Sequence, residues 1–137
     1  MATARTGRAP RFVYLCDGQR GQPGGRYGWR LVAANHRPLG RGRAAHDTLD
    51  ACRADAARVC GALERLQATV ITQDGMWYWQ AYLRGELAAM CVHSYLRRIE
   101  CARALTQFLA AARETEPAEG VVRHFGARSL RGYQIAP

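Results

Sequence analysis

The chain has 137 residues and a formal net charge of +9, a size at which one domain buries about two thirds of the surface that its unfolded chain would expose. Its longest uninterrupted apolar run, from Leu87 to Val92, is six residues long, whereas a bilayer span needs roughly 20. Residues 1–10 lack the apolar core of a secretory signal. We therefore expect one cytoplasmic domain without a membrane span, preceded by a flexible arm over residues 1–10.

The cysteines favour the same compartment, because they are five in number and form no C-x-x-C pair. Cys91 and His93 lie two residues apart and could share one face of a strand, but a metal ion usually needs a third or fourth ligand. Cys52 and Cys101 fall on the apolar stripes of two predicted helices, where a small core residue fits; a thiol function is the alternative. We predict no metal site and no cofactor.

The positive charge is concentrated in one part of the chain, and all 20 basic residues are arginines. Residues 1–43 contain nine arginines and one acidic residue, Asp17, which gives a net charge of +8. Residues 44–137 contain 11 arginines and ten acidic residues, a net charge of +1. Any electrostatic attraction of an anionic partner therefore belongs to the first part, although codon bias alone could produce the excess of arginine.

An internal repeat organises the sequence. Phe12 to Gly18 (FVYLCDG) corresponds to Thr69 to Gly75 (TVITQDG), and each is an apolar or β-branched run that ends in an Asp-Gly turn signal. The alternating segments from Tyr27 to Ala33 and from Trp77 to Leu83 align next, which makes Trp29 and Trp79 equivalent. Short third strands are expected near Pro38 to Arg41 and Leu87 to Val92.

A helix is predicted after each set of three strands. Asp47 or Thr48 can cap the first helix, which we expect to run to about Leu66, and Ser94 can cap the second, expected to run to about Arg113. A last strand follows from Val121 to Phe125. The sequence thus predicts an α+β domain of two tandem β-β-β-α(-β) repeats with a single, mainly antiparallel sheet and two helices on one face. The predicted parts are repeat 1 over residues 11–66, repeat 2 over 67–125 and a tail over 126–137.

Short sequence motifs support a resemblance to a known family. Trp29-Arg-Leu31-Val-Ala33-Ala34-Asn35-His36, followed by Leu39-Gly40, resembles the hairpin motif of the YegP-like family, small bacterial proteins of unknown function built from tandem copies of this unit. The second copy matches less well, because Leu83-Arg84-Gly85 replaces the Ala-Asn turn. The resemblance covers about residues 11–112. It implies one sheet shared by both repeats, with the strand after each helix exchanged between them, and it implies no catalytic residues.

No arrangement of residues typical of catalysis is present. The only serines are Ser94, assigned to a helix cap, and Ser129, in the predicted tail, so no nucleophile has a base at recognisable spacing. The run Gly40-Arg-Gly42-Arg lacks the spacing and the lysine of a phosphate-binding loop. We expect a protein that is not an enzyme.

The sheet face opposite the helices is the most informative predicted surface. If Trp29 and Trp79 point toward the helices, alternation directs Arg30, Tyr78, Gln80, Tyr82 and Arg84 the other way. Tyr14 could join them. Two helices cover only one face of a single sheet, so this surface is solvated, paired with another protein or occupied by a ligand.

Two functions fit these features. The first is a protein-interaction or assembly module, possible as a homodimer, that uses the open sheet face or an unpaired edge strand. The alternative is a low-specificity domain for single-stranded RNA or DNA, in which arginines neutralise phosphates and tyrosines stack on bases. The candidate contact residues are the same for both: Arg26, Arg30, Arg37, Arg41, Arg43, Tyr78, Gln80, Tyr82 and Arg84.

Overall fold

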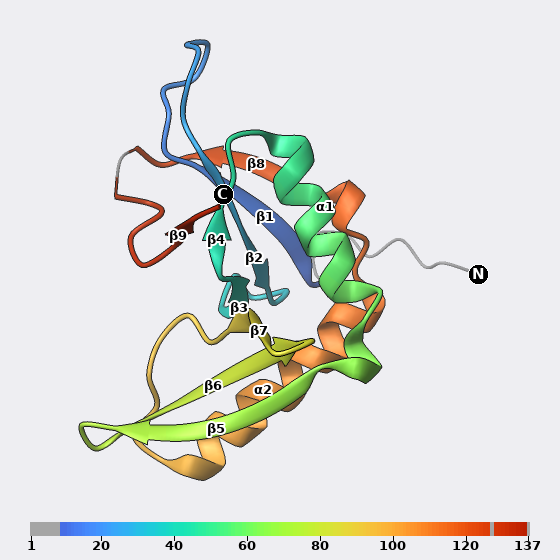
Figure 1. The fold of residues 1–137 in the computed structure, drawn as a ribbon, viewed down its shortest axis with the longest axis vertical. Coiled ribbons are helices and arrows are strands. Elements are labelled where there is room, and N and C mark those ends of the chain that lie inside the picture. Colours follow the sequence, from blue (N-terminus) through green and yellow to red (C-terminus); the bar gives the residue numbers. More distant parts are fainter. Residues whose placement is uncertain (1–8, 127, 137) are drawn as a thin grey trace.

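The computed structural model describes residues 9–126 and 128–136, and it has the predicted α+β fold with a mainly antiparallel sheet. Seven strands form one sheet in the order β5-β6-β7-β3-β2-β1-β8, and β4 and β9 form a small second pair (Figure 1). In chain order the elements are β1 (Arg11–Cys16), β2 (Tyr27–Val32), β3 (Pro38–Gly42), β4 (Ala44–Ala45), α1 (Leu49–Cys60), β5 (Gln67–Gln73), β6 (Met76–Leu83), β7 (Glu86–Met90), α2 (Arg98–Glu114), β8 (Val121–His124) and β9 (Gln134–Ile135).

Pairing between β3 and β7 joins the two groups of three strands into one sheet. It consists of the pairs Arg41 with Met90 and Gly42 with Ala89. Strand β8, which follows α2, returns to the first group and pairs with β1 in parallel, whereas all other pairs in this sheet are antiparallel. None of the helices in the described part of the chain is long and apolar enough to cross a membrane.

Two tight turns set the register of the second group. Asp74-Gly75 and Arg84-Gly85 all have positive φ, from 52° to 81°, as the type I′ turns of two-residue hairpins require. The first turn fixes the pairing of Gln73 with Met76, and the pairing then continues without a bulge to Gln67 with Tyr82. The faces of β5 and β6 are therefore fixed by the turn.

The helix ends differ from the prediction in two places. Thr48 caps α1 as expected, accepting a hydrogen bond from the Ala51 amide at 3.1 Å, but the helix ends at Cys60 and not near Leu66. Its last turn closes at Gly61, and a short 3₁₀ turn (Leu63–Arg65) leads into β5. Ser94 does not cap α2, because Tyr95 is held extended by two backbone hydrogen bonds to Trp77; α2 begins at Arg98.

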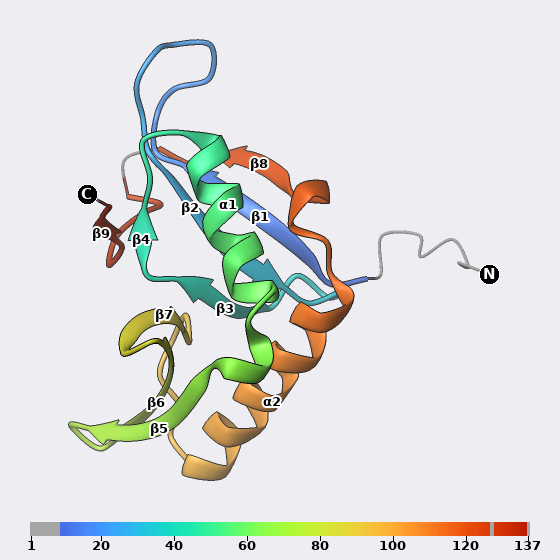
Figure 2. The ribbon, with the colours of Figure 1, turned by 45° about the vertical axis from the view of Figure 1, so that its right-hand side comes forward.

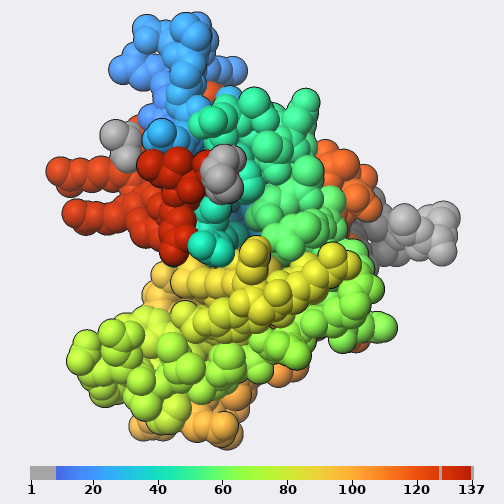
Figure 3. Space-filling view, in the orientation of Figure 1, coloured from blue at the N-terminus to red at the C-terminus, as the bar shows by residue number. Residues whose placement is uncertain are grey.

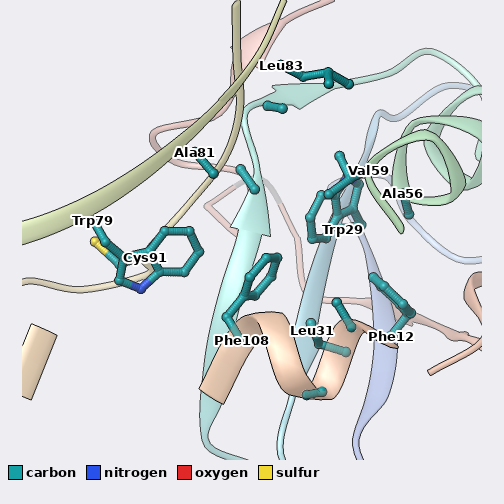
Figure 4. Packing of buried hydrophobic residues seen from close by; sticks show 14 of the residues in the cluster. Phe12, Trp29, Leu31, Ala56, Val59, Trp79, Ala81, Leu83, Cys91 and Phe108 are labelled. Atoms are coloured by element: carbon teal, nitrogen blue, oxygen red, sulfur yellow. The ribbon is translucent and has the colours of Figure 1, made fainter. Parts of the chain in front are cut away.

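The hydrophobic core lies between the sheet and the two helices, and Phe108 of α2 occupies its centre (Figure 4). The ring centroid of Phe108 lies 6.4 Å from that of Trp29 and 4.8 Å from that of Trp79, and all three side chains are fully buried. Gly40 and Gly42 of β3 permit this packing, since an added Cβ would collide with Phe108 at the first and with Trp29 at the second. The core thus joins the two groups of strands.

Tyr14, which alternation left as a possible member of the open face, lies in the core instead. It pairs with Trp29 across β1 and β2, so its side chain points toward the helices, and none of it is exposed. Its hydroxyl donates a hydrogen bond of 2.6 Å to the carbonyl of Pro117, and burial raises the pKa of this phenol well above its usual value. Tyr14 cannot contribute to a binding surface in this fold.

The C-terminal segment, residues 128–136, forms a layer on the sheet face opposite the helices. It was predicted to be a tail, but Leu130 and Tyr133 pack against Val13, Leu15 and Val32 in a second buried cluster. Strand β9 pairs in parallel with β4. Figure 2 shows α1 and α2 on one side of the sheet and β9 on the other. The part of the sheet formed by β1 and β2 is consequently covered on both of its faces.

Replacing Phe108 with alanine should lower the free energy of unfolding by about 3 to 5 kcal/mol, because a buried ring between two indoles is lost and the glycines of β3 cannot fill the space. Urea denaturation followed by tryptophan fluorescence measures this change. Gln107→Ala, at an exposed position of the same helix, is the control and should change stability by less than about 0.5 kcal/mol. A loss below about 1 kcal/mol in Phe108→Ala would contradict the central role of this ring.

Replacing Tyr133 with alanine should release the C-terminal segment from the sheet. The phenol ring stacks under the Arg41 guanidinium at 4.2 Å, and its hydroxyl donates a hydrogen bond of 3.0 Å to the carbonyl of Trp29. Hydrogen–deuterium exchange of residues 128–136 should accelerate by at least about tenfold in Tyr133→Ala. Tyr133→Phe keeps the ring and loses only the hydroxyl, about 1 kcal/mol, so it should accelerate less. Unchanged protection in Tyr133→Ala would show that the segment is held by other contacts.

Candidate functional site

Three of the predicted contact arginines lie at the C-terminal segment. Arg41 of β3 donates a hydrogen bond from Nη2 to the carbonyl of Gly132 at 3.0 Å and stacks on the ring of Tyr133. Arg43 donates from Nε to Oε1 of Gln134 at 2.7 Å. Arg30 of β2 is half-buried beside Tyr133, whose phenol pKa is raised mainly by burial and lowered in part by Arg41 and Arg30. The guanidinium groups of Arg41 and Arg43 therefore already have hydrogen-bond partners within the chain.

The other three predicted arginines lie in separate loops. Arg26 closes the long β1–β2 hairpin, where its guanidinium lies 3.8 Å from the carboxylate of Asp47. Arg37 is exposed in the turn between β2 and β3, and its amide donates to Oδ1 of Asn35. Arg84 lies in the β6–β7 turn and not on the strand face where alternation had directed it, because the turn requires its positive φ of 52°. The structure does not bring these three side chains together.

Tyr78, Gln80 and Tyr82 do lie together, on the face of β6 that points away from the helices. The residues between them, Trp79 and Ala81, are buried and point into the core, whereas the three side chains are half-buried. The Tyr82 hydroxyl donates a hydrogen bond of 3.0 Å to Oε1 of Gln80. The predicted alternation along this strand is therefore correct.

The register extends this face over three strands and shows that it carries no charged side chain. Residues paired across antiparallel strands point to the same side of a sheet, so each partner of Tyr78, Gln80 and Tyr82 joins them. Alternation along β5 and β6 adds the pair Gln73 and Met76. We name the resulting surface the tyrosine face; its members are Gln67, Thr69, Ile71, Gln73, Met76, Tyr78, Gln80, Tyr82, Leu87 and Met90.

The tyrosine face has a charged border. Asp74, Arg84 and Glu86 lie in or beside the two hairpin turns at its ends. On the side toward the first group of strands, Met90 pairs with Arg41, so the face ends where the C-terminal segment begins. Figure 3 shows this arrangement, with the C-terminal segment in red and the uncovered surface of β5 to β7 in green and yellow below it.

A groove of about 1000 Å³ lies on the other side of the molecule, between the β2–β3 turn and α2. Its lining combines Arg37 and Arg103 with Glu100, together with His93 and Tyr95. The charges are mixed, and the His93 ring contacts the Tyr95 ring and the carbonyl of Ser94. This groove therefore lacks the convergent charge that recognition of an anion or a cation would require.

At least three of the five thiols are made less reactive by burial, and the possible metal pair is not assembled. Burial raises the pKa of Cys52 to about 12 and that of Cys60 and Cys101 to about 11, so these thiols stay protonated and poorly nucleophilic near neutral pH. Cys91 is buried, whereas His93 is exposed. Within residues 9–126 and 128–136, no three His, Cys, Asp or Glu side chains are grouped as metal ligands would be.

Sequence reasoning missed the part of the tyrosine face that lies outside β6. Thr69 and Ile71 of β5 alternate with Ala68 and Val70, so the sequence indicates which residues share a side of the strand. It does not indicate which of the two sides is buried. Met90 could not be assigned at all, because β7 contains a register shift opposite Ala81 and Tyr82 that breaks the simple alternation.

Comparison with known proteins gives one structural relative. No protein-family model matches the chain, and no curated protein matches it. Among solved structures, the solution NMR structure of YegP from E. coli, a protein of unknown function, is similar with a TM-score of 0.61 and 11% identity, over 86% of this chain and 94% of that one. At this identity the likeness concerns the fold. The chain therefore has a YegP-like fold, as the sequence motif around Trp29 and Asn35 predicted.

Proposed function

We propose that this protein is a non-enzymatic interaction module that binds another protein surface through the tyrosine face. The observation that carries the proposal is the absence of charge on this face in a chain with 20 basic and 11 acidic residues. Side chains that only need to stay in water are commonly charged, and they are charged elsewhere on this molecule. A face of tyrosine, methionine, glutamine, threonine and leucine has the composition of the centre of a protein interface.

The arrangement of the face also suits such a role. Two tyrosines and two methionines supply large contact areas, and Gln80 holds the Tyr82 hydroxyl, which limits the side-chain entropy lost on binding. The charged residues Asp74, Arg84 and Glu86 form a polar, solvated rim at the ends of this face, as is typical around the apolar centre of a protein interface.

Binding of single-stranded nucleic acid is the second candidate, favoured by the net charge of +8 in residues 1–43. This candidate is weaker because the arginines and the tyrosines do not form one site. Arg41 and Arg43 are hydrogen-bonded to the C-terminal segment, and the tyrosine face itself offers no cation for a phosphate. Binding of this kind requires arginines beside the stacking rings.

Site-specific photo-crosslinking tests the proposal. A photoreactive phenylalanine derivative at position 78, in the cells that make the protein, should give a protein adduct of fixed mass. Tyr82→Ala or Gln80→Arg should reduce this adduct by at least about tenfold, because truncating a central tyrosine or placing a charge in an apolar interface costs about 2 kcal/mol. The same derivative at Thr106, exposed on α2, is the matched control and should give no such adduct.

Two results would contradict the proposal. The first is equal labelling from positions 78 and 106. The second is micromolar binding of single-stranded RNA or DNA, measured by fluorescence anisotropy, that falls with salt and is lost in Tyr78→Ala/Tyr82→Ala; this result would favour the nucleic-acid candidate.

A further inference from the structure

Strand β5 is an open edge of the sheet. It pairs with β6 on one side, and no backbone hydrogen bond in the described part of the chain reaches its other side. Five of its seven residues are exposed, and Figures 1 and 2 show it at the outside of the molecule. Since the hairpin turn makes Gln73 and Met76 a hydrogen-bonded pair, alternation turns the N–H and C=O groups of Ala68, Val70 and Thr72 outward.

This edge has none of the features by which proteins prevent pairing between sheets. Its sequence, QATVITQ, contains no charge, proline or glycine, and its pairing with β6 contains no bulge. Edge strands are usually protected by such residues, by shortness or by a covering segment. The opposite edge illustrates this protection, since β8 has four residues and includes Arg123 and His124. The two edges of one sheet thus differ in their exposure to a partner strand.

We propose that β5 pairs in antiparallel fashion with β5 of a second copy of this chain, around a two-fold axis at Val70. This register places Ala68 opposite Thr72 of the second copy and Val70 opposite Val70, so all three outward residues of each strand find partners. About six hydrogen bonds form in this register, and a shift of two residues in either direction leaves about four. The strand therefore complements itself best at one register, as an isologous interface requires.

The side chains at this register are compatible on both faces. Thr69 lies opposite Ile71 of the second copy and Gln67 opposite Gln73, which continues the uncharged tyrosine face across the axis. On the helix side Val70 is half-buried, and α2, which packs behind β5, carries the half-buried Leu105 and Leu109. The pairing brings no charged residue against a like charge.

The charge distribution also permits a second copy at this edge. The whole chain carries +9, but residues 67–116 contain five arginines and five acidic residues and are neutral. Two copies that meet at β5 thus approach through their neutral parts, and the dimer should depend little on salt, whereas binding of a nucleic acid would weaken as salt rises. The inference concerns the edge and does not require the tyrosine face to bind anything.

A charge exchange at the interface tests the proposal. Thr69→Lys/Ile71→Lys places lysines opposite each other twice around the axis, and Thr69→Glu/Ile71→Glu does the same with glutamates. Each double variant should dissociate at least about tenfold more readily than the unmodified protein, and an equal mixture of the two should recover a dimer because the opposed charges become complementary. Sedimentation velocity over a roughly hundredfold concentration range measures this against the monomer mass of 15.2 kDa.

Two further variants keep the test decisive. Ala68→Pro removes an outward N–H that the chain itself does not use, so it should give a folded monomer even if the charged variants lose stability. Gln80→Lys adds a charge on β6, next to Thr69 on the tyrosine face but away from the edge, and should leave the dimer intact. The inference is overturned by a monomer at all concentrations of the unmodified protein, by a dimer that Gln80→Lys abolishes and Ala68→Pro spares, or by open-ended aggregates.

Discussion

The packing of Phe108 between Trp29 and Trp79 is the contact on which the rest of the structure depends. Only two residue pairs connect β3 to β7, so the sheet alone holds its two groups of strands weakly. The three rings add a buried connection over the same junction, and the glycines of β3 make room for it. This packing fixes which side of β6 is buried. The tyrosine face exists because Trp79 is held in the core.

The two tryptophans are equivalent in position but not in their polar environment. The indole nitrogen of Trp29 donates a hydrogen bond of 2.8 Å to Asp55 on α1, and Asp55 also pairs with Arg58 at 3.0 Å. Within the described part of the chain, the indole nitrogen of Trp79 is buried without a hydrogen-bond partner, and α2 has the apolar Ala104 in the corresponding turn. The second group of strands thus depends more on apolar contact with α2, including its half-buried Leu105 and Leu109. This agrees with the absence of net charge over residues 67–116.

Most of the architecture was predictable from the sequence because its signals are local. Asp-Gly turns, alternation around Trp29 and Trp79, and Thr48 before an apolar stripe each specify structure over a few residues, and the order of strands and helices follows from them. The failures were long-range: the Tyr14 hydroxyl donates to the carbonyl of Pro117, and Tyr133 reaches back over 90 residues to Arg41, contacts that no local pattern contains.

The C-terminal segment occupies arginines of the first part of the chain that would otherwise be available to an external partner. From the sequence, Arg41 and Arg43 were candidates for an external anion, yet the structure satisfies them with a carbonyl, an amide and an aromatic ring of the same chain. A segment of this kind covers one half of a sheet face and leaves the other half open. The uncovered half is the one without charge, and it adjoins the one edge of the sheet without protective residues. Surface chemistry and strand geometry therefore both direct an interaction to β5, β6 and β7, away from the arginines that dominate the composition.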